Sequence, residues 1–279
     1  MVSIQVDPLS LTTHYLRMIS YGSDQVMSTA TGFIYEHDSC YYLITNAHNV
    51  TRINPETNQR ITTTAAFPVK IQIRCRVQIE GLFGVLKDFY DVDLYSDEDY
   101  KQPLWFVHPT HNYNVDVVAI KIEEKKNVDP SIKLFPINET AFDSEYPLQV
   151  SDDVYVLGYP FDTVGPLELP IWKRGTISTE PTTNIDNLPK FLIDTATRSG
   201  MSGSPVIMKR RGIHSPHPDM NFLRGDEIIG TIRNFAGVYS GRIGSTDNFQ
   251  AQLGIVWKAH VIDEIFAGRQ IGGIEFQKI

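Results

Sequence analysis

A serine, a histidine and an aspartate each stand in a context that suits nucleophilic catalysis. Ser202 lies between Gly200 and Gly203, directly ahead of an apolar run at 205–208. A serine nucleophile needs backbone N–H groups aimed at the oxyanion that forms when it attacks a carbonyl. Neighbouring glycines let the chain turn so that these groups converge. A plain turn before a strand has the same composition, so this segment alone does not establish catalysis.

The histidine and the aspartate both border apolar runs. His48 follows the run 41–45, and an imidazole readily accepts a proton near neutral pH. Asp116 opens the almost wholly apolar run 116–120. Burying a carboxylate at such a place costs free energy unless the carboxylate is paired or accepts hydrogen bonds. Alone, each also fits a structural role. Their order is His, Asp, Ser, with separations of 68 and 86 residues, and this order favours one joint site.

The elements that must position these residues are predicted to be mainly strands. Runs rich in Val, Ile, Tyr, Phe and Thr are bounded by Gly, Pro, Asn and Asp. Residues 70–79 alternate polar and apolar, which indicates a strand with one wet face. The one good helix candidate is 259–266, with Gly268 as a stop signal. The pattern predicts an all-β barrel or sandwich with a terminal helix. The predicted strands are 15–19, 32–35, 41–45, 69–79, 115–122, 154–157, 171–177, 191–193, 205–208, 228–239 and 253–257.

Two stretches lack a clear period. Residues 135–150 carry prolines and acidic residues and are predicted to link two halves of similar size. Residues 209–226 are predicted to form a long surface loop, in which the short basic run 209–211 is solvated.

Taken together, the motifs resemble the trypsin/chymotrypsin superfamily, in its bacterial-type branch of HtrA-like and glutamyl-endopeptidase-like enzymes. The segments that carry the resemblance, over about residues 12 to 268, are Thr45-Asn46-Ala47-His48, His108-Pro109 followed by Asp116-Val117-Val118, Gly200 to Pro205, Thr31-Gly32-Phe33-Ile34, Leu157-Gly158-Tyr159-Pro160 and Gly237-Val238-Tyr239-Ser240-Gly241. Asn46 replaces the commoner small residue.

This resemblance implies a fold of two antiparallel six-stranded β-barrels. The first, residues 8–137, would carry His48 and Asp116. The second, residues 138–279, would carry Ser202 and a terminal helix near 259–267. We expect no peptide-binding PDZ domain of the kind that HtrA-like enzymes append, because little sequence follows the predicted terminal helix.

The resemblance also implies a serine endopeptidase acting on protein or peptide substrates. His48 would take the proton of Ser202, Asp116 would orient His48, and the N–H groups of Gly200 and Ser202 would stabilise the oxyanion. No metal or organic cofactor is needed. The primary pocket would have its base at Ala196 and Thr197, and the strand holding Val238, Tyr239, Ser240 and Gly241 would pair with substrate. The absence of a carboxylate there favours a small or medium apolar residue before the scissile bond.

One departure concerns the catalytic loop. Met201 stands where digestive enzymes carry the aspartate that receives a new N-terminal ammonium on activation. We therefore expect no activation by N-terminal processing. The way the loop is ordered is left open. The alternative function is a latent or inactive protease-fold binding protein that needs a substrate or a regulatory partner chain to order the Met201 loop.

Charge and composition limit the partners. The formal net charge is −8 and no large basic cluster exists, which argues against nucleic acid and anionic membrane as partners. Neither a secretory leader nor an apolar stretch of about 20 residues is visible, so a cytoplasmic location is expected. Cys40 and Cys75 do not match the superfamily's usual disulfide beside the histidine. Free thiols are expected, and their pairing stays open.

Two other chemistries fit less well. His108, His111, His214 and His217 could suggest a metal site, but they lack the cysteine or carboxylate spacing of zinc sites. An α/β-hydrolase esterase would place its serine between a strand and a helix, with the histidine last in the chain. Here a strand follows Ser202, and His48 comes first.

Overall fold

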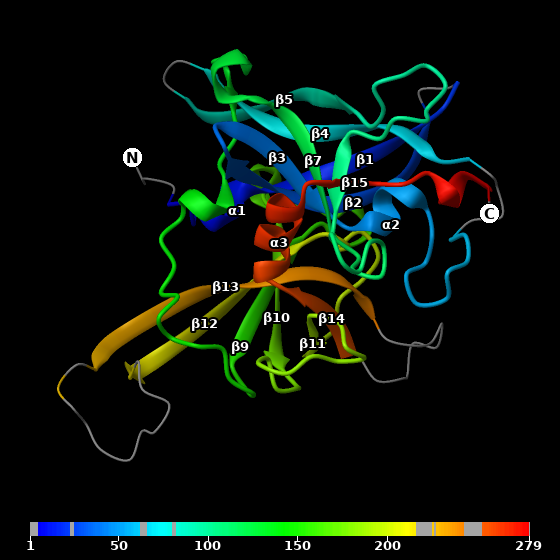
Figure 1. Cartoon of the computed structure of the whole chain (residues 1–279). Helices are drawn as coiled ribbons and strands as arrows, with labels where there is room; N and C mark the ends of the chain where they lie inside the picture. Colours follow the sequence, from blue (N-terminus) through cyan, green and yellow to red (C-terminus); the bar gives the residue numbers. More distant parts are fainter. Residues whose placement is uncertain are drawn as a thin grey trace.

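Two antiparallel β-sheets, one above the other in Figure 1, form the framework of the computed structural model. The structure describes residues 5–22, 25–61, 66–79, 82–215, 225, 227–242 and 253–278. The expected all-β class and two-barrel, chymotrypsin-like architecture are confirmed. None of the described helices combines the length and the apolar character that a membrane crossing requires.

The first sheet is curled and has six long strands and three short ones. The spatial order is β15-β6-β7-β3-β2-β1-β4-β5, and β8 pairs with β4. The strands are β1 (Thr13–Ser20), β2 (Val26–His37), β3 (Cys40–Thr45), β4 (Pro68–Ile79), β5 (Leu82–Asp93), β6 (Trp105–Val107), β7 (Val118–Glu124), β8 (Ile132–Lys133) and β15 (Gln270–Ile271).

The second sheet closes into a six-stranded barrel in the order β10-β11-β14-β13-β12-β9. Its strands are β9 (Asp153–Gly158), β10 (Ile171–Ile177), β11 (Lys190–Thr195), β12 (Pro205–His214), β13 (Ile228–Arg242) and β14 (Leu253–Lys258). The helices are α1 (Leu9–Thr12), α2 (Ala47–Thr51) and α3 (His260–Gly268), with short 3₁₀ turns η1 (Lys125–Asn127), η2 (Ile137–Glu139), η3 (Pro160–Asp162), η4 (Pro166–Glu168) and η5 (Glu275–Lys278).

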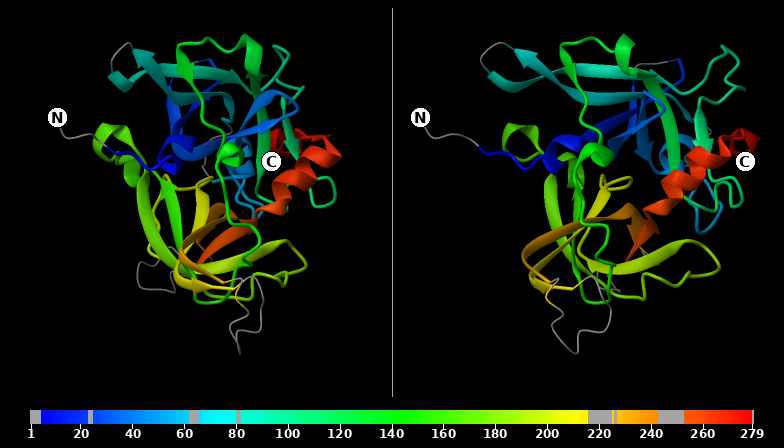
Figure 2. Two further views of the ribbon diagram at one scale, coloured as in Figure 1. Left: turned by 90° about the vertical axis from the view of Figure 1, so that its left-hand side faces the viewer. Right: turned by 60° about the vertical axis from the view of Figure 1, so that its left-hand side comes forward.

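Helix α3 is the predicted terminal helix, and it lies between the two sheets (Figures 1 and 2). Its apolar face buries Val261, Ile262, Ile265 and Phe266. These side chains join a core that also contains Phe33 of the first sheet and Trp257 of the barrel. The burial of this shared apolar surface holds the two β-units together. Each unit has a further core of its own.

The alternation predicted for β4 is confirmed over residues 70–75. Ile71, Ile73 and Cys75 are buried, whereas Lys70, Gln72 and Arg74 are partly exposed. Cys75 and the half-buried Cys40 are both free thiols. Burial raises the pKa of Cys75 to about 12. Residues 135–150 contain the turn η2 and no strand.

The prediction of a solvated loop over 209–226 is wrong for its first part. Strand β12 runs through His214 and pairs with β13 along its whole length, so the basic run 209–211 is strand. The guanidinium of Arg210 reaches back to Asp152, with Nη2–Oδ2 2.6 Å and Nε–Oδ1 2.7 Å. Only 7% of the Asp152 side chain is exposed. This partner lies 58 residues away in the chain, and local composition did not reveal it. Residues 216–224 and 226 lie outside the described residues.

The Asp152–Arg210 pair can be compared with its neighbour on the surface. Asp153 makes a similar fork with Arg174, but these side chains are 34% and 66% exposed. We expect Asp152→Asn to lower the free energy of unfolding by about 3 kcal/mol, because it leaves a partly buried guanidinium without its counter-charge. The matched control Asp153→Asn should cost less than about 1 kcal/mol. Urea denaturation measures both, and equal losses would contradict the assignment.

A second buried polar group makes stability depend on pH. His14 of β1 is 3% exposed, and its Nδ1–H donates to the carbonyl of Arg74 at 3.0 Å. Burial lowers the pKa of His14 to about 4, and the hydrogen bond to Arg74 only partly opposes this. Between pH 4 and 6.5 the unfolded chain therefore binds a proton that the folded chain excludes.

Stability should accordingly fall as pH drops from 6.5 to 4, with a contribution from His14 of roughly 3 kcal/mol. His14→Gln keeps a donor for the Arg74 carbonyl and does not titrate, so its stability should change less over this window. The exposed His260 provides the control, and His260→Gln should keep the wild-type dependence. Urea midpoints at several pH values test this. A His14→Gln curve parallel to wild type would refute it.

Candidate active site

Strand β3 leads directly into α2, which holds His48 in its first turn. The His48 side chain is 13% exposed. Asn46 precedes the helix with extended backbone, and its Nδ2 donates to the carbonyl of Asp116 at 2.7 Å. The residue that departs from the superfamily motif thus fixes the backbone of Asp116 relative to the helix.

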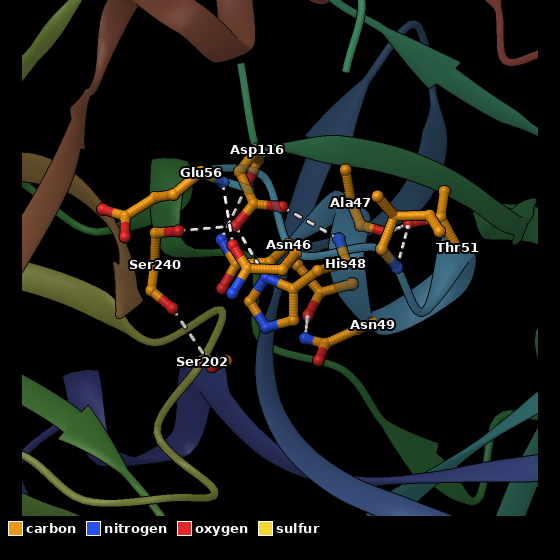
Figure 3. Close-up of polar contacts among 12 residues, drawn as sticks. Asn46, Ala47, His48, Asn49, Thr51, Glu56, Asp116, Ser202 and Ser240 are labelled. Carbon is orange, nitrogen blue, oxygen red and sulfur yellow. Dashed lines mark hydrogen bonds and ion pairs between the residues drawn. The ribbon is translucent and has the colours of Figure 1, made fainter. Parts of the chain in front are cut away.

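The carboxylate of Asp116 lies at the centre of the polar contacts in Figure 3. Asp116 is fully buried, just ahead of β7. Its Oδ1 accepts the backbone N–H of His48 at 2.8 Å. Its Oδ2 accepts from Nδ1 of His48 at 2.7 Å and from the hydroxyl of Ser240 at 2.5 Å. Because Nδ1 donates to a carboxylate, the lone pair of a neutral imidazole is on Nε2.

Ser202 lies in the tight loop before β12, below the imidazole in Figure 3. Its hydroxyl donates to the carbonyl of Ser240 at 3.1 Å. Gly200 and Gly203 flank it with φ of +92° and +84°. A Cβ at Gly200 would stand 2.3 Å from the carbonyl oxygen of Tyr159, and one at Gly203 would stand 2.2 Å from that of Thr31. Both positions therefore require glycine.

His48 and Ser202 line one open cleft of about 200 Å³. The other lining residues are Asn54, Pro55, Glu56, Ile61, Ser240, Gly241, Arg242 and Ile255. The structure thus joins His48 of α2 to Asp116, just ahead of β7, by hydrogen bonds and places His48 in the same cleft as Ser202 of the loop before β12. A second cavity of about 410 Å³ opens beside His48 and Asp116, and Glu56 and Glu275 are among its lining residues.

The predicted substrate-binding residues are divided between the cleft and the cores. Ser240 and Gly241 line the cleft, as expected for a strand beside the substrate. Val238 does not, because the pleat of β13 turns its side chain into the core between the sheets. Tyr239 points into the barrel core, where its hydroxyl bonds to the hydroxyl of the buried Thr197. Ala196, next to Thr197, is half-buried.

One role was missed from sequence. Ser240 was predicted only as a substrate contact, yet its hydroxyl bonds to Asp116 and its carbonyl accepts the hydroxyl of Ser202. Sequence gives no direct signal for this role, since Ser240 and Asp116 are 124 residues apart.

Two histidines of the metal hypothesis, His108 and His214, have other partners. Nε2 of His108 donates to Glu264 of α3 at 2.8 Å, and Nδ1 accepts the backbone N–H groups of Thr110 and His111. Nε2 of His214 donates to the carbonyl of Gly230. His217 lies outside the described residues. Within the described ranges no group of three or more His, Cys, Asp or Glu residues could hold a metal ion.

Comparison with known proteins identifies the family of the chain. Residues 30–212 match the family described as a trypsin-like peptidase domain, and the match includes His48, Asp116 and Ser202. No curated protein sequence matches the chain. Among solved structures, an inactive serine-to-alanine mutant of Rv3671c from M. tuberculosis H37Rv is 16% identical, with a TM-score of 0.45, over 93% of this chain and 86% of that chain. The active form of the Rv3671c protease is 15% identical, with a TM-score of 0.45, over 95% and 82%.

Proposed function

The chain belongs to the trypsin-like peptidase family, and we propose that it is a serine endopeptidase with Ser202 as nucleophile, His48 as general base and Asp116 as the group that orients His48. The observation that carries this proposal is the 2.7 Å bond from Nδ1 of His48 to the buried Asp116, together with the cleft that His48 and Ser202 both line. This bond holds the imidazole in the tautomer whose Nε2 accepts a proton.

The proposed reaction is acyl transfer through Ser202. The hydroxyl leaves its bond to the Ser240 carbonyl and gives its proton to Nε2 of His48 while Oγ attacks the scissile carbonyl. Asp116 stabilises the resulting imidazolium. The imidazolium protonates the leaving amine as the C–N bond breaks, and the acyl-enzyme forms. Water, deprotonated by His48, then releases the carboxylic acid and restores Ser202.

The oxyanion would be held by the N–H groups of Gly200 and Ser202. Two bonds support this role. The Ser199 carbonyl accepts the N–H of Phe161 at 2.8 Å, and the Met201 carbonyl accepts the N–H of Ser204 at 3.1 Å. In a trans peptide the N–H points opposite to the C=O. The amides of Gly200 and Ser202 thus point away from these two partners, and in the described part of the chain neither amide has an acceptor.

A substrate preference follows from Tyr239. Its ring is buried beside Gly254, where a Cβ would stand 2.7 Å from the ring, and its hydroxyl bonds to Thr197 at the base expected for the primary pocket. Burial raises the pKa of Tyr239 to about 12, so this hydroxyl stays protonated and able to donate. We propose that Tyr239 fills the base of the pocket and that the residue before the scissile bond is small.

The alternative is a protease-fold binding protein that is latent or inactive until a partner or substrate orders the Met201 loop. Met201 itself is fully buried in the barrel core, which favours a loop that is already ordered. A reactive fluorophosphonate separates the two functions, since it modifies only an activated serine.

We expect the fluorophosphonate to label wild-type protein at Ser202 and to leave Ser202→Ala and His48→Ala unlabelled. Peptide-library cleavage should fall by about 10⁴-fold or more in both variants, because the nucleophile and base act as a unit. The control is Ser178→Ala, which changes an exposed serine that does not line the cleft and should behave as wild type. Wild type that neither labels nor cleaves under any condition would favour the binding protein.

For specificity, we expect wild type to prefer Ala or Gly over Leu or Phe before the scissile bond. Tyr239→Ala should shift the kcat/KM ratio of Leu to Ala substrates by about ten-fold or more, because a larger pocket accepts extra methylenes. Tyr239→Phe keeps the ring and should keep the preference. If Tyr239→Ala does not fold, the wild-type profile still decides: a preference for large residues would exclude the proposed pocket.

A further inference from the structure

The loop that carries Ser202 is held by one residue of the other β-unit. Thr31 lies in β2 and is fully buried. Its hydroxyl donates to the carbonyl of Gly200 at 2.8 Å, and its backbone N–H donates to the carbonyl of Ser202 at 2.9 Å. A single threonine thus binds the carbonyl oxygens on both sides of Met201.

The remaining groups of this loop are also fixed. The N–H of Met201 donates to the Arg198 carbonyl at 3.3 Å, and the N–H of Gly203 donates to the Tyr239 carbonyl at 2.9 Å. With Phe161 and Ser204 on the carbonyls of Ser199 and Met201, every peptide from Ser199 to Gly203 has a partner for at least one of its polar groups. Among these described peptides, only the N–H groups of Gly200 and Ser202 have no acceptor.

Thr31 is itself held in one orientation. Its carbonyl accepts the hydroxyl of Thr45 at 2.9 Å, and its own hydroxyl oxygen accepts the N–H of Tyr159 at 3.2 Å. The Thr45 hydroxyl in turn accepts from Nδ2 of Asn49 at 2.9 Å. Asn49 is the residue after His48 in α2. A continuous chain of buried hydrogen bonds therefore joins the helix of the base to the loop of the nucleophile.

We infer that Thr31 is a positioning residue that keeps the Gly200–Ser202 loop in its oxyanion-binding conformation. The inference rests on the proposed function. A peptide whose carbonyl has lost its buried partner can rotate, and the neighbouring peptide rotates with it. Without the hydroxyl of Thr31, the Gly200–Met201 peptide keeps only the long 3.3 Å bond from the N–H of Met201 to the Arg198 carbonyl. The adjoining amides of Gly200 and Ser202 then lose their fixed direction.

The test uses the full chain and a peptide that wild type cleaves. In Thr31→Val, which removes the hydroxyl at nearly constant shape, we expect kcat to fall about 100-fold, on the order of losing one oxyanion donor, with KM within about three-fold of wild type. A peptide aldehyde, whose adduct with the serine carries the oxyanion, should bind correspondingly more weakly. Thr31→Ser restores the hydroxyl and should restore kcat to within about three-fold.

The control is Thr12→Val, which also removes a buried hydroxyl that donates to a carbonyl, at Leu9. It should change the melting temperature without changing kcat, and so measures the purely structural effect. If Thr31→Val does not fold, Thr31→Ala removes the same hydroxyl without added bulk and should show the same loss of kcat. An active wild type with an equally active, folded Thr31→Val or Thr31→Ala overturns this inference alone. A wild type without cleavage or fluorophosphonate labelling overturns the proposed function instead.

Discussion

A single buried carboxylate sets the conditions that the rest of the site must meet. Asp116 has no exposed surface, and a charge removed from water is stable only if hydrogen bonds replace its hydration. It accepts two bonds from His48 and one from Ser240. His48 belongs to the first β-unit and Ser240 to the second. The carboxylate can therefore be satisfied only when the two units are packed in one relative position.

The packing between the units enforces that position by apolar and polar contacts together. The core around α3 contains side chains from both sheets and resists separation, since its burial is the main stabilising term. Apolar contact alone is not directional. Hydrogen bonds are directional. Those from Thr31 to the Ser202 loop and from Ser240 to Asp116 therefore fix the orientation of one β-unit relative to the other. A structure that only needed stability would not require these polar contacts.

Much of this arrangement could be predicted from sequence because the relevant signals are local. The alternation of residues 70–75, the period of helix α3 and the glycines around Ser202 each report the environment of a short segment. Their motifs and their order predicted His48, Asp116 and Ser202 as the catalytic residues. Their contacts were beyond local reasoning. The Arg210–Asp152 pair, the Ser240 hydroxyl on Asp116 and the inward turn of Val238 depend on strands that are distant in the chain. The sequence pattern of a strand predicts which of its faces is buried. It does not predict which residue from a distant part of the chain contacts that face.

Met201 stands where the digestive enzymes of the superfamily carry an aspartate, and its burial explains why an apolar residue suits this position. A carboxylate at that place would be buried in the barrel core and would need a cation to accompany it. The methionine needs only packing, which Val206 and Tyr239 of the same core supply. An apolar side chain there removes the requirement for a charge delivered from elsewhere. Thr31 then holds the adjoining carbonyls by neutral hydrogen bonds, whose strength does not depend on the protonation of an ammonium group. We therefore expect the order of the loop to depend on the docking of the two β-units rather than on the processing of a chain end.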